Sequence, residues 1–205
     1  MKKLFLSSSF ADVMDLFIHF IGDIRGKTIT FITTASNVEK ITFYVEKAKQ
    51  AFIQQGAQID ELDVTKATFT QISDKLNHND FIYVSGGNTF FLLQELKRSG
   101  ADKLIIQQVN AGKLYIGESA GAMIVSPDIN YVELMDSREP AADLVDNNAL
   151  NLVKFYPVPH YTNFPFIEAA QHIIDTYSAT LNLIPITNTQ AIVVNNDIVE
   201  IKTQN

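Results

Sequence analysis

The residue with the clearest chemical potential in this sequence is Ser119, at the centre of the run Gly-Glu-Ser-Ala-Gly at residues 117–121. An apolar, β-prone run at residues 114–116 precedes it and small, helix-compatible residues follow it, which predicts a strand, a sharp turn and a helix. This is the pattern of a nucleophile elbow. We expect its glycines to leave room around the serine Oγ, and the helix N-terminus to offer free N–H groups to an oxyanion. The alternative is an ordinary tight turn between a strand and a helix.

A second candidate segment is Ser-Gly-Gly-Asn-Thr-Phe at residues 85–90, directly after an apolar run at residues 81–84. A Gly-Gly pair at the end of a strand exposes backbone N–H groups that can bind a phosphate or an oxyanion. The segment lacks the third glycine of a dinucleotide fingerprint and the Gly-Lys-Ser/Thr of a P-loop. One wall of an oxyanion hole is therefore the better interpretation.

The candidate general base is His160, in the run Pro-Val-Pro-His-Tyr-Thr-Asn at residues 157–163. A serine nucleophile needs a base that titrates near pH 7, and histidine is the side chain that does so unperturbed. The other three histidines lie in an amphipathic helical pattern (His19), a polar turn (His78) and a late helical pattern (His172), where a surface or core-edge place is expected. A structural role for His160 is the alternative.

A third residue should orient the imidazole, and acidic residues between Ser119 and His160 are the candidates. The chain order serine, acid, histidine is the order of elbow-type hydrolases. Spacing alone does not choose among them, and most must be solvated loop charges. The candidates are Asp128, Glu133, Asp136, Glu139, Asp143 and Asp146.

The elements that must position these residues alternate between strand and helix patterns. This rhythm predicts an α/β fold, a mainly parallel sheet with helices on both faces and ligands at the carboxyl ends of the strands. A single domain over residues 1–205 fits the length. The expected strands are residues 4–7, 28–33, 59–64, 80–84, 114–116 and 183–184, followed by a hairpin at 191–202, and the expected helices are 11–24, 38–55, 66–76, 88–99, 102–111 and 165–177. Residues 126–150 show no sustained period and are expected to form a long functional loop.

The composition limits the function classes. A net charge of −7 with scattered lysines and arginines argues against a nucleic-acid partner. The absence of cysteine excludes a disulfide framework, a thiolate metal site and a cysteine nucleophile. The apolar run behind the first residues is too short for a secretory signal, and no run approaches the roughly twenty apolar residues of a membrane span. We expect a soluble cytoplasmic protein with a small-peptide substrate, no membrane contact and neither cofactor nor metal; the sequence does not indicate the oligomeric state.

The three motifs together, in this order and at these separations, resemble the peptidase E family of serine dipeptidases, which is related to cyanophycinase. The resemblance implies a class I glutamine amidotransferase-like fold in which serine replaces the usual cysteine. It matches Ser119 to the nucleophile, His160 to the base, and the N–H groups of Gly87 and Ala120 to the oxyanion hole. The family's acid lies about fifteen to eighteen residues past the serine, which favours Asp136, with Glu133 and Glu139 behind it.

The sequence departs from the family at the arginine that aspartyl dipeptidases carry beyond the histidine motif. The last arginine here is Arg138, so a strict preference for N-terminal aspartate does not carry over. Asn88, Glu118 and Arg138 are predicted to bind substrate, Glu118 through an ammonium group; a buried, paired carboxyl is the alternative for Glu118. The function expected is hydrolysis of short peptides through an acyl-enzyme. An esterase or isopeptidase on the same site and a catalytically idle binding protein are the alternatives.

Overall fold

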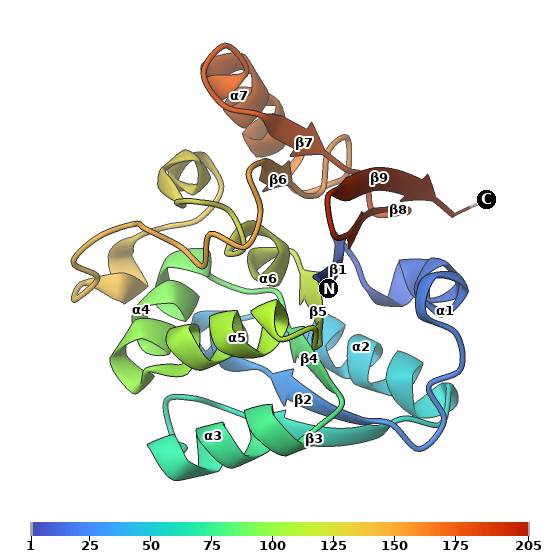
Figure 1. Ribbon diagram of the computed structural model, residues 1–205. Helices are drawn as coiled ribbons and strands as arrows, with labels where there is room; N and C mark the ends of the chain where they lie inside the picture. The colour runs from blue at the N-terminus through green and yellow to red at the C-terminus, as the bar shows by residue number, and fades with distance from the viewer. Residues whose placement is uncertain (1, 205) are drawn as a thin grey trace.

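The computed structural model describes residues 2–204, and a seven-stranded sheet crosses its centre (Figure 1). The strands are β1 (Lys3–Ser7), β2 (Thr28–Ile32), β3 (Gln58–Leu62), β4 (Phe81–Val84), β5 (Leu114–Glu118), β8 (Gln190–Asn195) and β9 (Ile198–Thr203). Their spatial order is β3-β2-β4-β5-β1-β8-β9. The first five in this order are parallel, β8 is antiparallel to β1, and β9 is antiparallel to β8. The predicted hairpin at 191–202 is thus confirmed as β8 and β9.

Helices cover both faces of this sheet, as the alternating sequence pattern predicts. The α-helices are α1 (Met14–Ile21), α2 (Phe43–Gln54), α3 (Phe69–His78), α4 (Thr89–Ser99), α5 (Ala101–Asn110), α6 (Ala120–Met123) and α7 (Ile167–Tyr177). Phe5 of β1 packs in one core cluster with α1 and α2, whereas its neighbours Leu4 and Leu6 belong to the cluster that α3, α4 and α5 cover. Successive strand residues point to opposite faces, so strands buried on both sides read as continuous apolar runs.

Three predicted helices begin or end elsewhere. The helix expected at 38–55 begins only at Phe43 as α2, after the 3₁₀ turn η2 (Thr34–Val38). The pattern at 11–24 forms a short 3₁₀ turn, η1 (Ala11–Val13), followed by α1. The helix expected from residue 66 begins as α3, where Thr68 and Gln71 form a capping box: the Thr68 hydroxyl accepts the Gln71 N–H and the Gln71 side chain accepts the Thr68 N–H. The side-chain cap fixes the first turn three residues later than the apolar period alone predicts.

A smaller parallel sheet lies beside the main one and was only partly visible in the sequence. It consists of β6 (Tyr156–Val158) and β7 (Leu183–Pro185), which lie with α7 in the upper part of Figure 1. The strand at 183–184 is expected from its residues, but its pairing with residues 156–158 is not, because the two runs are separated by α7. Within residues 2–204, every helix is too short or too polar to cross a bilayer.

The irregular segment at 126–150 contains two 3₁₀ turns, η3 (Asn130–Leu134) and η4 (Glu139–Ala141). Buried side chains, rather than long helices or strands, fix the position of this segment. Tyr131 is fully buried, and its hydroxyl donates to the Pro157 carbonyl over 2.7 Å. This bond joins the segment to β6. The prediction of a single domain over residues 1–205 extends to Met1 and Asn205, which lie outside the described residues, and it stays a prediction.

Candidate active site

Ser119 stands on a strained turn at the carboxyl end of β5. Its φ of 50° and ψ of −108° lie outside the regions that non-glycine residues ordinarily occupy, a conformation that costs about 1–3 kcal/mol and is held by its surroundings. Its N–H donates to the Ser7 carbonyl over 2.9 Å, and its own carbonyl accepts the N–H groups of Ala122 and Met123. The turn from β5 into α6 is the strand, turn and helix predicted for a nucleophile elbow.

The glycines of the elbow serve a different purpose from the one expected. A Cβ on Gly117 would come within 2.3 Å of the Gly121 carbonyl oxygen, and one on Gly121 within 2.2 Å of the Val84 carbonyl oxygen. Both positions lack a side chain so that α6 can pack directly on the backbones of β5 and β4. Close packing of the elbow, rather than open space around the Ser119 Oγ, is therefore the reason for these two glycines.

The imidazole of His160 meets the Ser119 hydroxyl. The Oγ lies 3.0 Å from Nε2, within hydrogen-bond reach, and His160 itself has a positive φ of 60°. The His160 N–H donates to the Ser8 Oγ over 2.9 Å, and its ring stacks on Phe166 with 4.7 Å between the ring centroids. Burial lowers the pKa of His160 below its usual value, while Asn188 acts in the opposite direction. The backbone bond to Ser8 and the stacking on Phe166 therefore hold the ring in place. Its lowered pKa favours the neutral imidazole, the form that can act as a base.

The residue that orients the imidazole is Asn188, not Asp136 as the sequence predicts. His160 Nδ1 lies 2.8 Å from the Asn188 Oδ1, in the turn between β7 and β8. An amide oxygen accepts from Nδ1–H, which leaves the Nε2 lone pair facing the Ser119 hydroxyl. The Asn188 N–H in turn donates to the Asn163 Oδ1 over 2.9 Å, so the last residue of the histidine motif fixes this turn.

Asp136 lies instead at the start of α4. Its Oδ2 accepts the Thr89 N–H over 2.8 Å, and burial raises the pKa of its carboxyl to about 6, partly offset by Thr89. Asn88 caps the same helix: its Oδ1 accepts the Phe91 N–H and its Nδ2 donates to the Ser137 carbonyl. Both ends of the Asn88 amide are thus engaged inside the protein, and its predicted role in binding substrate stays a prediction. The reserve candidates for the acid, Glu133 and Glu139, are exposed.

The two N–H groups predicted for the oxyanion hole lie on either side of the Ser119 turn. Among the hydrogen bonds of residues 2–204, neither the Gly87 nor the Ala120 N–H has a partner. Gly87 has a φ of 132°, and a Cβ there would lie 2.2 Å from the Ala35 backbone; a Cβ on Gly86 would lie 3.2 Å from the Ser119 Cβ. The Gly-Gly pair therefore runs directly beside the serine. Because α6 has only four residues, its N–H groups matter individually and its dipole contributes little.

Glu118 does not face a substrate, contrary to the prediction. Its side chain is 3% exposed, and the carboxylate accepts the Phe10 N–H over 2.8 Å and the Tyr83 hydroxyl. Burial raises the pKa of Glu118 to about 7 against the lowering effect of these donors. The alternative of a buried, paired carboxyl is what the structure shows.

Arg138 is held by the segment that carries it. Its guanidinium donates to the Asn147 Oδ1 over 2.6 Å and to the Leu144 carbonyl over 2.8 Å, and lies 5.6 Å from the centre of the Phe90 ring. These contacts fold residues 126–150 onto α4. That Arg138 binds substrate stays a prediction.

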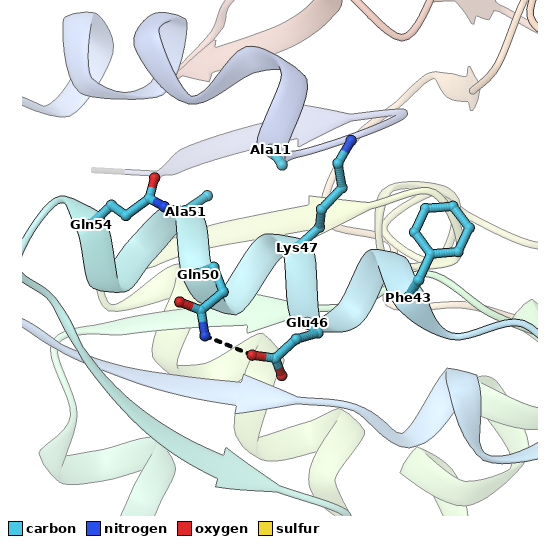
Figure 2. Close-up of a pocket in the computed structure, with 7 residues that line it drawn as sticks. All are labelled: Ala11, Phe43, Glu46, Lys47, Gln50, Ala51 and Gln54. Carbon is cyan, nitrogen blue, oxygen red and sulfur yellow. Dashed lines mark hydrogen bonds between the residues drawn. The ribbon is translucent and has the colours of Figure 1, made fainter.

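A surface hollow along α2 is separate from these residues (Figure 2). It is lined by Ala11, Phe43, Glu46, Lys47, Gln50, Ala51 and Gln54. Its polar side chains are paired among themselves and with their neighbours, Gln50 with Glu46 at 2.7 Å and Lys47 with Asp12 at 3.4 Å. It includes none of the predicted site residues. Within residues 2–204, no three His, Asp or Glu side chains gather closely enough to hold a metal ion.

Comparison with known proteins gives one family. The family model described as peptidase family S51 matches residues 4–202. An uncharacterized peptidase of Pasteurella multocida is 66% identical over 197 residues, which cover 96% of this chain and 95% of that protein. A peptidase E of a Nostoc species is 30% identical over 170 residues, covering 79% of this chain and 66% of the relative.

A solved structure shows the same architecture. The crystal structure of a Listeria monocytogenes protein, provisionally assigned as a peptidase E, has a TM-score of 0.97 and 53% identity, with all of both chains covered. The mainly parallel sheet with helices on both faces is therefore shared along the whole chain, and it is consistent with the class I glutamine amidotransferase-like fold.

Proposed function

Because the chain belongs to peptidase family S51 and is a serine-type peptidase, we propose that it hydrolyses short peptides through an acyl-enzyme formed on Ser119, as a dipeptidase E-like enzyme. The observation that carries the proposal is the contact of 3.0 Å between the Ser119 Oγ and the His160 Nε2, with Nδ1 held by Asn188. A nucleophile, its base and a group that orients the base are the three parts that nucleophilic catalysis by serine requires.

In the first half of the reaction the Ser119 Oγ attacks the peptide carbonyl while His160 Nε2 takes the hydroxyl proton. The carbonyl oxygen becomes an oxyanion, to which the N–H groups of Gly87 and Ala120 donate. Loss of one such donor costs about 10²- to 10³-fold in kcat in a well-studied serine protease. The glycine at position 87 supports this role, because its backbone conformation and its contact with Ala35 both exclude a side chain.

In the second half the His160 imidazolium returns its proton to the leaving amine, and the C–N bond breaks to leave the acyl-enzyme. Water, deprotonated by the same imidazole, then attacks the ester and releases Ser119. Asn188 can hold the required tautomer throughout, since its Oδ1 accepts from Nδ1–H in both protonation states. It cannot neutralise the imidazolium as a carboxylate does.

Substrates without an N-terminal aspartate fit the surroundings of Ser119 best. A substrate carboxylate in a partly desolvated site needs a paired cation, ideally an arginine fork. No arginine follows Arg138 in the chain, and the Arg138 guanidinium is bound to Asn147 and Leu144. The nearby carboxyl of Asp136, by contrast, adds negative charge at the start of α4.

The proposal is tested with a fluorophosphonate probe followed by a dipeptide library. Wild-type protein should react with the probe at Ser119, and Ser119→Ala should not; His160→Ala should react far more slowly, because its serine is no longer activated. Dipeptides should then be cleaved at their single peptide bond. A wild-type protein that the probe does not label would indicate an idle fold, and turnover of esters without any peptide would indicate an esterase.

A further inference from the structure

Glu118 is a buried carboxyl directly before Ser119 that the proposed reaction does not use. It ends β5, where it pairs with Ser7 of β1, and its side chain is turned away from solvent. Two donors reach it, the Phe10 N–H at 2.8 Å and the Tyr83 hydroxyl. A buried carboxylate is costly unless several donors surround it, so this arrangement requires an explanation.

The first donor ties Glu118 to the segment that holds the histidine. Phe10 ends a loop that leaves β1 at Ser7, whose carbonyl accepts the Ser119 N–H. In the same loop the Ser8 Oγ accepts the His160 N–H over 2.9 Å and donates to the Ile186 carbonyl over 3.1 Å. Phe10, which donates to Glu118, is thus only two positions from Ser8, which binds the backbone of His160. A shift of Phe10 would therefore move the support of the base.

The second donor, the Tyr83 hydroxyl, ties Glu118 to β4, the strand that leads into the segment carrying an oxyanion N–H. Gly86 precedes Gly87, and it lies so close to the elbow that an added Cβ would come within 3.2 Å of the Ser119 Cβ. Tyr83, two residues before Ser85 at the end of β4, adds its hydroxyl from the strand below this loop. The carboxylate thus contacts the loop after β1 and the strand that leads into the Gly86-Gly87 segment.

We propose that Glu118 is a positioning residue, which gathers the loop after β1 and the loop after β4 against the elbow and so sets where His160 and the Gly87 N–H stand relative to the Ser119 Oγ. The inference rests on the proposed function, since it concerns the same serine.

The charge state of the carboxyl determines how many of these contacts form. An ionised carboxylate accepts from both the Phe10 N–H and the Tyr83 hydroxyl, whereas a protonated carboxyl or an amide presents a donor of its own to one of them. The groups that face it are Tyr83 from β4, Tyr44 from α2 and Asp12 from η1, and the Asp12 carboxylate acts with burial to raise the pKa of Glu118. Tyr44 and Tyr83 have raised pKa values and stay neutral.

The test compares Glu118→Gln with Glu95→Gln at pH 8. Glu95 is an equally buried glutamate, 4% exposed, whose carboxylate pairs with Arg98 on α4. For Glu118→Gln we expect kcat and the rate of fluorophosphonate labelling to fall together, by about tenfold or more, with little change in KM, because the substrate is still bound while the reacting groups are displaced. Glu95→Gln should stay within about twofold of the wild type in both rates.

Equal labelling of wild type and Glu118→Gln would overturn the inference while leaving the proposed function intact; an unlabelled wild type would overturn both. If Glu118→Gln does not fold, as judged by near-ultraviolet circular dichroism, Glu118→Asp replaces it. Its carboxylate keeps the charge but is one methylene too short to reach all the donors. A lowered kcat at unchanged KM supports the positioning role, and an unchanged kcat overturns it.

Discussion

The two sides of the candidate site are built by different means. Ser119 and Gly87 follow strands β5 and β4 of the main sheet, and their positions are set by backbone geometry that leaves no room for a side chain at residues 87, 117 and 121. His160 and Asn188 follow β6 and β7 of the small sheet and are held by side chains that are distant in sequence, Ser8 and Asn163. The first side is therefore marked by glycines that can be recognised in the sequence, whereas the second depends on polar side chains that come from distant parts of the chain.

The strongest test of this comparison is to remove one residue from each side. Ser119→Ala and His160→Ala should each lower kcat by about 10⁶-fold, the loss for the equivalent serine and histidine of a well-studied serine protease. Because the two side chains act as a unit, the double variant should be scarcely worse than either single variant, as measured by peptide turnover. Losses that add in the double variant would show that the 3.0 Å contact is not a working pair.

The next test separates the residue that the structure places on the imidazole from the one that the sequence predicts. Asn188→Ala should lower kcat by roughly 10³-fold, because an imidazole in the wrong tautomer or orientation cannot accept the Ser119 proton. Replacing the residue that orients the histidine of a well-studied serine protease costs about 10⁴-fold in kcat. Asp136→Asn should cost less than about tenfold, since an asparagine Oδ1 can still accept the Thr89 N–H. A larger loss of kcat in Asp136→Asn than in Asn188→Ala would show that Asp136, as the family resemblance implies, orients the imidazole.

The sequence allowed Ser119, Gly87 and His160 to be predicted and missed Asn188 for a physical reason. The Gly-x-Ser-x-Gly turn, the Gly-Gly pair and the Pro-His run each carry their signal within a few residues, because each needs an unusual backbone. Asn188 carries none: it is one polar residue in the turn Thr187-Asn188-Thr189, and its role arises only when β7 pairs with β6. Asn188 is also an amide rather than an acid, and it lies beyond His160 instead of between Ser119 and His160.

The sheet itself was predicted well because its central strands β1, β2, β4 and β5 are buried on both faces and the helices that cover it have clear periods. The buried carboxyl of Glu118 was not predictable from spacing. Its neighbours in sequence are the elbow residues, but its donors come from Phe10 and Tyr83, more than thirty residues away. Pairing of this kind follows from the order of strands, which a strand pattern alone does not give.

The pH dependence of kcat/KM in Asn188→Asp tests whether residue 188 contacts the His160 ring. In Asn188→Asp a carboxylate would face Nδ1 and favour the imidazolium, so the pKa of His160 should rise. Since the neutral ring is the base, activity is lost below the pKa, and the acidic limb of kcat/KM should move to higher pH by about one unit. The wild-type limb should lie below the usual histidine value, because burial lowers the pKa of His160. Identical profiles for the two proteins would mean that residue 188 does not contact the ring during turnover.

The smallest effect expected is one of specificity. Asp-Leu should be hydrolysed no faster than Asn-Leu or Ala-Leu, within about threefold in kcat/KM, because no arginine follows Arg138 in the chain and the Arg138 guanidinium is bound to Asn147 and Leu144. Arg138→Ala should leave the three values in the same ratio. A hundredfold preference for Asp-Leu, roughly 2.7 kcal/mol, would contradict this, and its loss in Arg138→Ala would identify Arg138 as the cation after all.

The antiparallel addition of β8 to β1 also has a consequence for the order of events during synthesis. β1 pairs with residues near the other end of the chain, Leu4 with Val194 and Ser7 with Ala191, and the turn that carries Asn188 leads directly into β8. The ribosome therefore makes the serine and its glycines long before the strand that locks the support of the imidazole. Contacts so far apart in sequence form late, because a long loop must close first. A nascent chain that already contains the elbow thus remains inactive until its last strands have docked.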